Sequence, residues 1–160
     1  AYDPYIENHQ FIDKKVTRVG VEELLNKSDV ISVHIPLNKE TNNMINKEWF
    51  KKMKKGSYFV TTARGSIHNE DDLYEAITSG HLAGAGLDVW GYEPPASSHK
   101  LLKLDNVIAS PHTAGVTQDS RNKMSEFVAT QLLNLFDGEG PARPVNPEVI
   151  DTYRKKFKNL

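Results

Sequence analysis

The amino-acid sequence predicts an α/β fold with a doubly wound parallel sheet. Two features of the chain point to it: short apolar runs rich in β-branched residues recur along the sequence, and segments with helical periodicity lie between them. Strands that are apolar on both faces are typical of a parallel sheet covered by helices. Their alternation with helices is the pattern of successive βαβ units.

Four apolar runs have the length and composition of strands, at residues 30–35, 58–62, 82–89 and 107–109. A fifth and weaker candidate spans residues 16–19. The third run contains Gly84-Ala85-Gly86, which looks like the start of a phosphate-binding G-x-G-x-x-G motif. That motif must follow a strand and open a helix, so we interpret these glycines as positions of close strand packing.

Helices are expected between and after these runs, over residues 21–27, 47–54, 70–79 and 117–137. Asn46 and Asn69 are suited to cap the second and third of these helices, and Gly56 and Gly80 are suited to end them. The last helix carries apolar residues at i, i+3 and i+4 spacing, which gives it one apolar face. Glycine and proline become frequent from Gly138, so we expect one domain over residues 1–140 and a tail over residues 141–160.

Composition excludes several classes of protein. The 160 residues include no cysteine, 20 basic and 21 acidic side chains, and the formal net charge is −1. The absence of cysteine excludes disulfide frameworks and thiolate metal sites, and it fits a reducing cytoplasm. No apolar run approaches the roughly 18 residues of a membrane span. The near-neutral net charge lacks the excess of basic residues that is typical of nucleic-acid-binding proteins. We therefore expect a cytoplasmic protein without a metal, membrane or nucleic-acid partner.

Chemically useful side chains follow three successive runs, where the ligands of open α/β sheets bind. Arg64 follows the second run, Asp88 lies at the end of the third with Glu93 after it, and His112 follows the fourth. Taken singly, each is usually structural, as a surface arginine or a residue at a strand end. Together they suit a carbonyl acid: arginine pairs with a carboxylate, histidine exchanges a proton, and a nearby carboxylate holds its tautomer.

Two further strand ends carry weaker indications. Asp3 could accept hydrogen bonds from an adenosine ribose, although Asp3-Pro4 is also a common turn. The first long run ends at His34-Ile35-Pro36, for which a strand-ending histidine beside a proline is the ordinary interpretation.

Five segments occur in the order and spacing of one known family across about residues 1–147. They are Ala1-Tyr2-Asp3-Pro4, residues 29–37 with Thr41, Ala63-Arg64-Gly65, Gly86-Leu87-Asp88-Val89 with Glu93-Pro94, and Pro111-His112-Thr113-Ala114-Gly115. Together they resemble the D-isomer-specific 2-hydroxyacid dehydrogenases. The resemblance implies a partial Rossmann-type NAD-binding domain, with helices on both faces of the sheet. It also implies an oxidoreductase that interconverts a D-2-hydroxyacid and a 2-oxoacid.

The resemblance also implies a role for each candidate residue. Arg64 would bind the substrate, Glu93 would be the acid partner, and His112 would be the general acid/base. The implied NAD contacts are Asp3, His34, Ile35, Pro36, Thr41, Thr62, Ala63, Arg64, Asp88, His112 and Gly115. The expected partners are a small 2-hydroxy or 2-oxo acid and either a second copy of the chain or an N-terminal portion.

In the family, a substrate domain and a glycine-rich loop precede the position of residue 1. We therefore expect a fragment of a longer enzyme, which binds NAD weakly and turns over slowly on its own. The alternative is a catalytically weak NAD-binding or co-repressor-like module. A formate-type dehydrogenase is a third possibility, but it would carry a neutral amide where Glu93 stands. The sequence does not choose among lactate, glycerate and phosphoglycerate.

Overall fold

The computed structural model describes residues 1–157 and divides into two compact units, residues 1–114 and the part from residue 115 onward. The boundary therefore differs from the one expected at residue 140. The reason is that the long helix near residue 130 packs with the segment that follows it. The backbone N–H of Ala142 donates to Gln131 Oε1 (2.6 Å), and the Tyr153 hydroxyl donates to the carbonyl of Leu135 (2.9 Å).

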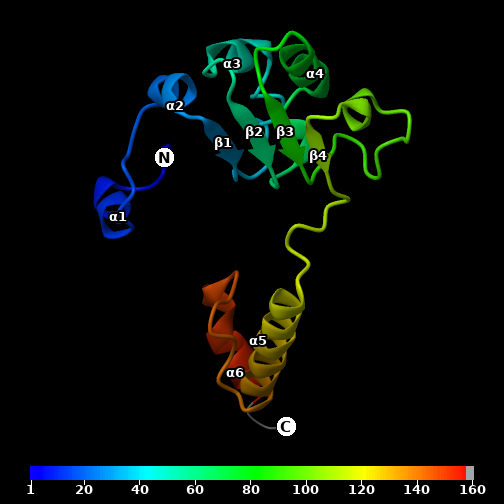
Figure 1. Cartoon of the computed structure of the whole chain (residues 1–160). Coiled ribbons are helices and arrows are strands. Elements are labelled where there is room, and N and C mark those ends of the chain that lie inside the picture. The colour runs from blue at the N-terminus through cyan, green and yellow to red at the C-terminus, as the bar shows by residue number, and fades with distance from the viewer. Residues whose placement is uncertain (158–160) are drawn as a thin grey trace. The chain divides into compact units, whose positions relative to one another are not determined.

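The first unit is built on a four-stranded parallel sheet in the order β1-β2-β3-β4 (Figure 1). The strands are β1 (Val30–Val33), β2 (Tyr58–Thr61), β3 (Gly84–Leu87) and β4 (Val107–Ala109). Val33, Thr61, Leu87 and Ala109 are aligned in register. All four strands therefore end at one rim, and the predicted α/β fold with a parallel sheet is confirmed.

The prediction of a strand over residues 16–19 is wrong. This segment joins no sheet: Val16 N–H donates to the carbonyl of Phe11 (2.9 Å) and Val19 N–H donates to the carbonyl of Ala1 (3.0 Å). A β-branched run becomes a strand only where a neighbouring strand accepts its hydrogen bonds. A short helix, α1 (Asn8–Asp13), was not predicted, because its polar sequence has no apolar periodicity.

The predicted helices of the first unit are present as α2 (Val21–Lys27), α3 (Lys47–Lys52) and α4 (Glu70–Thr78). Asn46 accepts from the backbone N–H of Glu48 (3.1 Å) and Asn69 from that of Asp72 (2.9 Å), as expected of N-caps. Short 3₁₀ turns follow as η1 (Gly65–Ile67) and η2 (Lys100–Lys103).

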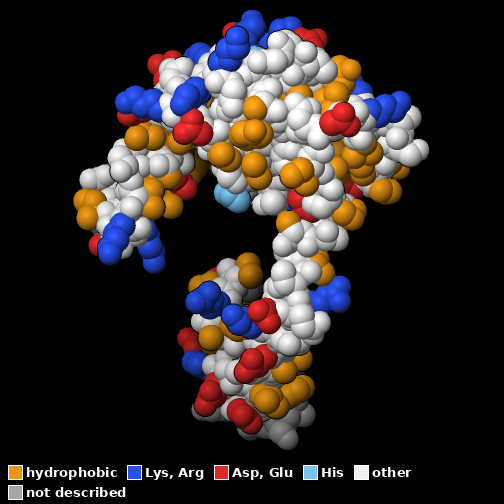
Figure 2. Space-filling model, in the orientation of Figure 1, with side chains coloured by type: hydrophobic (Ala, Val, Ile, Leu, Met, Phe, Trp, Pro, Cys, Tyr) orange, Lys and Arg blue, Asp and Glu red, His pale blue; other side chains and the backbone are white. Residues whose placement is uncertain are grey.

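The hydrophobic core lies on one face of the sheet. Phe59 and Leu87 point into it from the strands and meet Phe50 of α3 and Leu73 of α4, all of them at most 2% exposed. Figure 1 shows α3 and α4 on this side of the strands. Alternate positions on the opposite face stay exposed, including Val30, Tyr58 and Ile108. Apolar side chains are accordingly visible over the strands in Figure 2.

The second unit contains α5 (Gln118–Phe136), a 3₁₀ turn η3 (Pro147–Val149) and α6 (Ile150–Phe157). The predicted long helix is confirmed, and it begins at a capping box between Thr117 and Ser120. Its apolar residues are at least half exposed at Met124, Phe127 and Val128. No helix within residues 1–157 is long and apolar enough to cross a membrane.

Candidate active site

The residues that follow β2, β3 and β4 meet at the rim where the strands end. Arg64 lies three residues after the last residue of β2, Glu93 lies in the loop after β3, and His112 lies in the loop after β4. The aligned register of the strands brings these loops to neighbouring positions.

His112 and Glu93 are in direct contact. His112 Nδ1 lies 2.7 Å from Glu93 Oε2, and the two side chains are 44% and 36% exposed. The other oxygen, Oε1, accepts from the backbone N–H of Trp90 (3.0 Å). The hydrogen bond from His112 lowers the pKa of Glu93, as do the N–H of Trp90 and the positive charge of Arg64. The ionised carboxylate therefore holds the ring proton at Nδ1 and leaves Nε2 for another partner.

Asp88 fixes the loop that carries His112. Its carboxylate is buried and accepts from the Ser110 hydroxyl (2.5 Å) and from the backbone N–H groups of Thr113 (2.8 Å) and Ala114 (3.0 Å). Burial raises the pKa of Asp88, but these hydrogen bonds outweigh it and the net shift is downward. The backbone of His112 has φ of 56° and donates its N–H to the carbonyl of Asp88 (2.8 Å). These bonds compensate a conformation that non-glycine residues rarely adopt.

A close backbone contact joins the loop of Arg64 to the loop of Glu93. A Cβ atom on Gly65 would lie 1.9 Å from the carbonyl carbon of Trp90, so only glycine fits at residue 65. Trp90 is 4% exposed, and its indole Nε1 donates to the carbonyl of Ser110 (3.1 Å). Arg64 itself is exposed, and its Nη1 donates to the carbonyl of Ala63 (2.6 Å). The guanidinium is therefore accessible beside the His112–Glu93 pair.

Several of the predicted cofactor contacts follow β1 at the same rim. His34 Nε2 lies 2.7 Å from the Ser32 hydroxyl, and the carbonyl of Pro36 accepts from the Thr41 hydroxyl (2.7 Å). Ile35 between them is half-buried. After β2, Thr62 is exposed and Ala63 is buried.

Two predicted contacts lie elsewhere in the chain. Asp3 precedes α1, and its carboxylate accepts from the backbone N–H of Tyr5 (2.9 Å) in a local turn. Gly115 belongs to the second unit, where its carbonyl accepts from the Ser120 hydroxyl (2.6 Å).

A second histidine–carboxylate pair near the rim was not predicted. Glu70 Oε2 lies 3.3 Å from His99 Nε2, and Glu70 Oε1 accepts from the backbone N–H of Gly91 (2.8 Å). In the sequence, Glu70 is one of three acids in the first turn of α4, where acidic residues commonly stand. Its partners lie 21 and 29 residues further along the chain, and no local pattern indicates a pairing at that separation.

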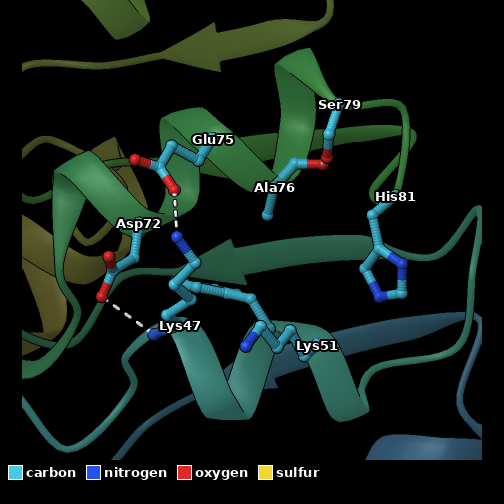
Figure 3. A pocket seen from close by; sticks show the side chains of 8 residues that line it. Lys47, Lys51, Asp72, Glu75, Ala76, Ser79 and His81 are labelled. Atoms are coloured by element: carbon cyan, nitrogen blue, oxygen red, sulfur yellow. Dashed lines mark hydrogen bonds and ion pairs between the residues drawn. The ribbon is translucent and has the colours of Figure 1, made fainter.

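A cavity of about 200 Å³, lined by both apolar and charged residues, lies between α3 and α4 (Figure 3). Lys47 contacts two acids of this lining: its Nζ lies 2.6 Å from Glu75 Oε2, and its backbone N–H donates to Asp72 Oδ2 (2.8 Å). None of the candidate residues lines this cavity. Within residues 1–157, no group of three or more His, Asp or Glu side chains is placed to hold a metal ion.

Comparison with protein families identifies residues 1–114 as a match to the model of the D-isomer-specific 2-hydroxyacid dehydrogenase NAD-binding domain. The chain belongs to this family. NAD is the cofactor of the matched domain, and the family is the one that the sequence motifs predicted.

Named relatives of the chain act on different acids. It is 42% identical over 145 residues to a glyoxylate reductase of Thermofilum pendens, covering 91% of this chain and 41% of the relative. It is 42% identical over 151 residues to a D-3-phosphoglycerate dehydrogenase of Archaeoglobus fulgidus, covering 94% and 29%. The crystal structure of Aquifex aeolicus D-lactate dehydrogenase with NAD and lactic acid matches with a TM-score of 0.73 at 34% identity, covering 86% and 46%. The chain thus spans less than half the length of these relatives.

Proposed function

We propose that this chain carries the hydride-transfer site of an NAD-dependent D-2-hydroxyacid dehydrogenase. The observation that carries the proposal is the 2.7 Å contact between His112 Nδ1 and Glu93 Oε2 beside the charge of Arg64. A paired histidine with a free second nitrogen is suited to exchange a proton with a carbonyl oxygen. The proposed substrate is a small 2-oxoacid or the corresponding 2-hydroxyacid.

Each residue has a distinct task in the proposed reaction. Bound NADH supplies the hydride that reduces the carbonyl carbon of the 2-oxoacid. His112 gives the proton at Nε2 to the carbonyl oxygen, and it takes that proton back in the reverse direction. Glu93 holds the proton at Nδ1 and stabilises the charged ring. Arg64 binds the carboxylate of the substrate through its planar fork.

The residues present fit the two ends of NAD better than its middle. The residues after β1, from His34 to Thr41, would hold the adenine side, and Thr62, Ala63 and Asp88 would lie near the nicotinamide. Within residues 1–157, no glycine-rich loop follows a strand and opens a helix, which is the usual cradle of a pyrophosphate. Gly84 lies inside β3, where a Cβ atom would come within 2.3 Å of the carbonyl oxygen of Asn106. We therefore expect weak NADH binding and slow turnover.

Single-turnover hydride transfer tests the proposal even if binding is weak. The chain at high concentration is incubated with 4-deuterated NADH and either pyruvate or glyoxylate, and the product is analysed by mass spectrometry. We expect deuterium at carbon 2 of lactate or glycolate, and D-lactate from pyruvate. The Arg64→Lys variant should need about tenfold more 2-oxoacid for the same rate, because lysine lacks the bidentate fork.

Arg121→Lys, in exposed α5, is the matched control and should behave like the wild-type chain. If the wild-type chain transfers no deuterium at saturating cofactor and substrate, the proposal fails. Binding of NADH without transfer would instead favour the binding module.

A further inference from the structure

Glu70 connects the turn that follows Arg64 to the loop that carries Glu93. It is the first residue of α4, and its two carboxylate oxygens reach different partners. Oε1 accepts from the backbone N–H of Gly91 (2.8 Å), and Oε2 lies 3.3 Å from His99 Nε2. The Glu70 and His99 side chains are only 23% and 22% exposed. The pair is therefore more protected from water than the exposed ion pairs of the helices.

The hydrogen bonds of His99 define where its ring proton lies. The backbone N–H of Leu101 donates to His99 Nδ1 (3.3 Å), so the proton is on Nε2 and is donated to Glu70. Glu70 thus accepts from two fixed donors, the Gly91 N–H and the His99 Nε2–H. A carboxylate can accept both, whereas an amide of the same shape has one oxygen and can accept only one of them.

These two donors belong to residues that adjoin Trp90. Gly91 follows Trp90 in the chain, and the ring of His99 packs edge-on against the indole with centroids 5.3 Å apart. The backbone N–H of Trp90 is also the group that donates to Glu93 Oε1. A displacement of Trp90 would therefore move the donor that orients the Glu93 carboxylate toward His112.

We propose that Glu70 and His99 are positioning residues, which hold the loop of Trp90, Gly91 and Glu93 in the geometry that keeps Glu93 against His112. The pair touches neither the proposed substrate nor the reacting atoms, and it acts through the backbone of the loop. The expected effect on hydride transfer rests on the proposed function, but the expected effect on the Glu93–His112 contact does not.

Nuclear magnetic resonance of the whole chain tests the proposal without any need for turnover. Two readouts are needed: hydrogen exchange at the Gly91 amide, and the pKa of the Glu93 carboxyl followed by its carbon resonance. In Glu70→Gln we expect faster exchange at Gly91 and a pKa of Glu93 that rises toward the ordinary range, because the His112 contact loosens. His99→Leu should produce the same changes.

Two further variants separate positioning from a general effect on stability. His99→Gln keeps an N–H donor toward Glu70 and should restore both readouts toward those of the wild type. Asp71→Asn removes a neighbouring acid of α4 that pairs with Lys100 (2.6 Å), and it should leave both readouts unchanged. All measurements are made well below the melting temperature of the variant concerned.

The proposal is overturned if Glu70→Gln and His99→Leu lower the melting temperature but leave the pKa of Glu93 and the exchange of Gly91 at their wild-type values. In the deuteride assay we expect Glu70→Gln to slow transfer about tenfold with unchanged NADH affinity, because a small misplacement of an acid partner is costly. A wild-type chain that transfers no hydride would contradict the proposed function, while the resonance measurements would still decide the role of Glu70 and His99.

Discussion

Two histidine–carboxylate pairs stand near the same rim, and they differ in which atoms remain free. In the His112–Glu93 pair the ring keeps Nε2 available, and both side chains are more than one third exposed. In the His99–Glu70 pair both ring nitrogens are engaged, by Leu101 and by Glu70, and Glu70 also accepts from Gly91. In our proposals, the same two chemical groups serve a reaction in one place and hold a loop in the other.

A third histidine completes the comparison. His68 is 4% exposed, and neither of its ring nitrogens has a hydrogen-bond partner among the described residues. Burial lowers the pKa of His68 from 6.5 to about 4. It shows what burial does to an imidazole without a hydrogen-bond partner: desolvation outweighs the opposing charge of Glu70, and the ring stays neutral at neutral pH.

The largest expected effect comes from removing the free nitrogen. His112→Ala should slow hydride transfer about a thousandfold, because the carbonyl oxygen loses its proton donor. NADH affinity, measured by calorimetry, should stay within a factor of about two or three of the wild type. Unchanged hydride transfer in His112→Ala would show that the His112–Glu93 pair, like the His99–Glu70 pair, has only a structural role.

The next effect is on stability and concerns His68. Because the folded pKa is depressed, the unfolded chain binds more protons between pH 6.5 and about 4, and stability falls as pH decreases through that window. The loss amounts to roughly 3 kcal/mol. His68→Val should remove this component of the acid destabilisation, measured by urea unfolding at pH 7 and at pH 4.5.

His9→Gln, at an exposed position of α1, serves as the control for the loss of a titrating imidazole. An equally steep loss of stability in His68→Val and the wild type would mean that other groups cause the acid sensitivity.

A smaller effect is expected from neutralising the acid partner. Glu93→Gln should slow transfer about tenfold, the equivalent of one charge-assisted hydrogen bond of about 1.5 kcal/mol. The wild-type pair should persist below the ordinary pKa of a glutamate and break as pH falls through the lowered pKa of Glu93. The rate of the wild type should therefore fall at acidic pH, and the rate of Glu93→Gln should lack this fall. If the fall occurs at the same pH in Glu93→Gln, a group other than Glu93 causes it.

The order of the elements could be predicted from the sequence, but their ends could not. Runs such as residues 30–35 and 82–89 indicate strands because they are apolar on both faces, whereas β1 and β3 stop where their partners do, at Val33 and Leu87. The candidate strand at residues 16–19 had the right composition and no neighbour to pair with.

The meeting of Arg64, Glu93 and His112 could be expected from one rule, that parallel strands end at one rim. Side-chain pairing over long separations follows no such rule. Glu70 and His99 look like an ordinary helix acid and a loop histidine until packing brings them together. His68 is buried with its ring against Phe59, and nothing in its neighbours along the chain signals a buried imidazole.

The way Asp88 holds the His112 loop has a consequence for how this region can vary. The loop contributes backbone amides of Thr113 and Ala114, and their side chains take no part in these bonds. A library of all substitutions at these two positions should therefore recover most amino acids with the loop intact, proline excepted because it lacks the amide hydrogen. The side chains at positions 113 and 114 could then vary without moving His112.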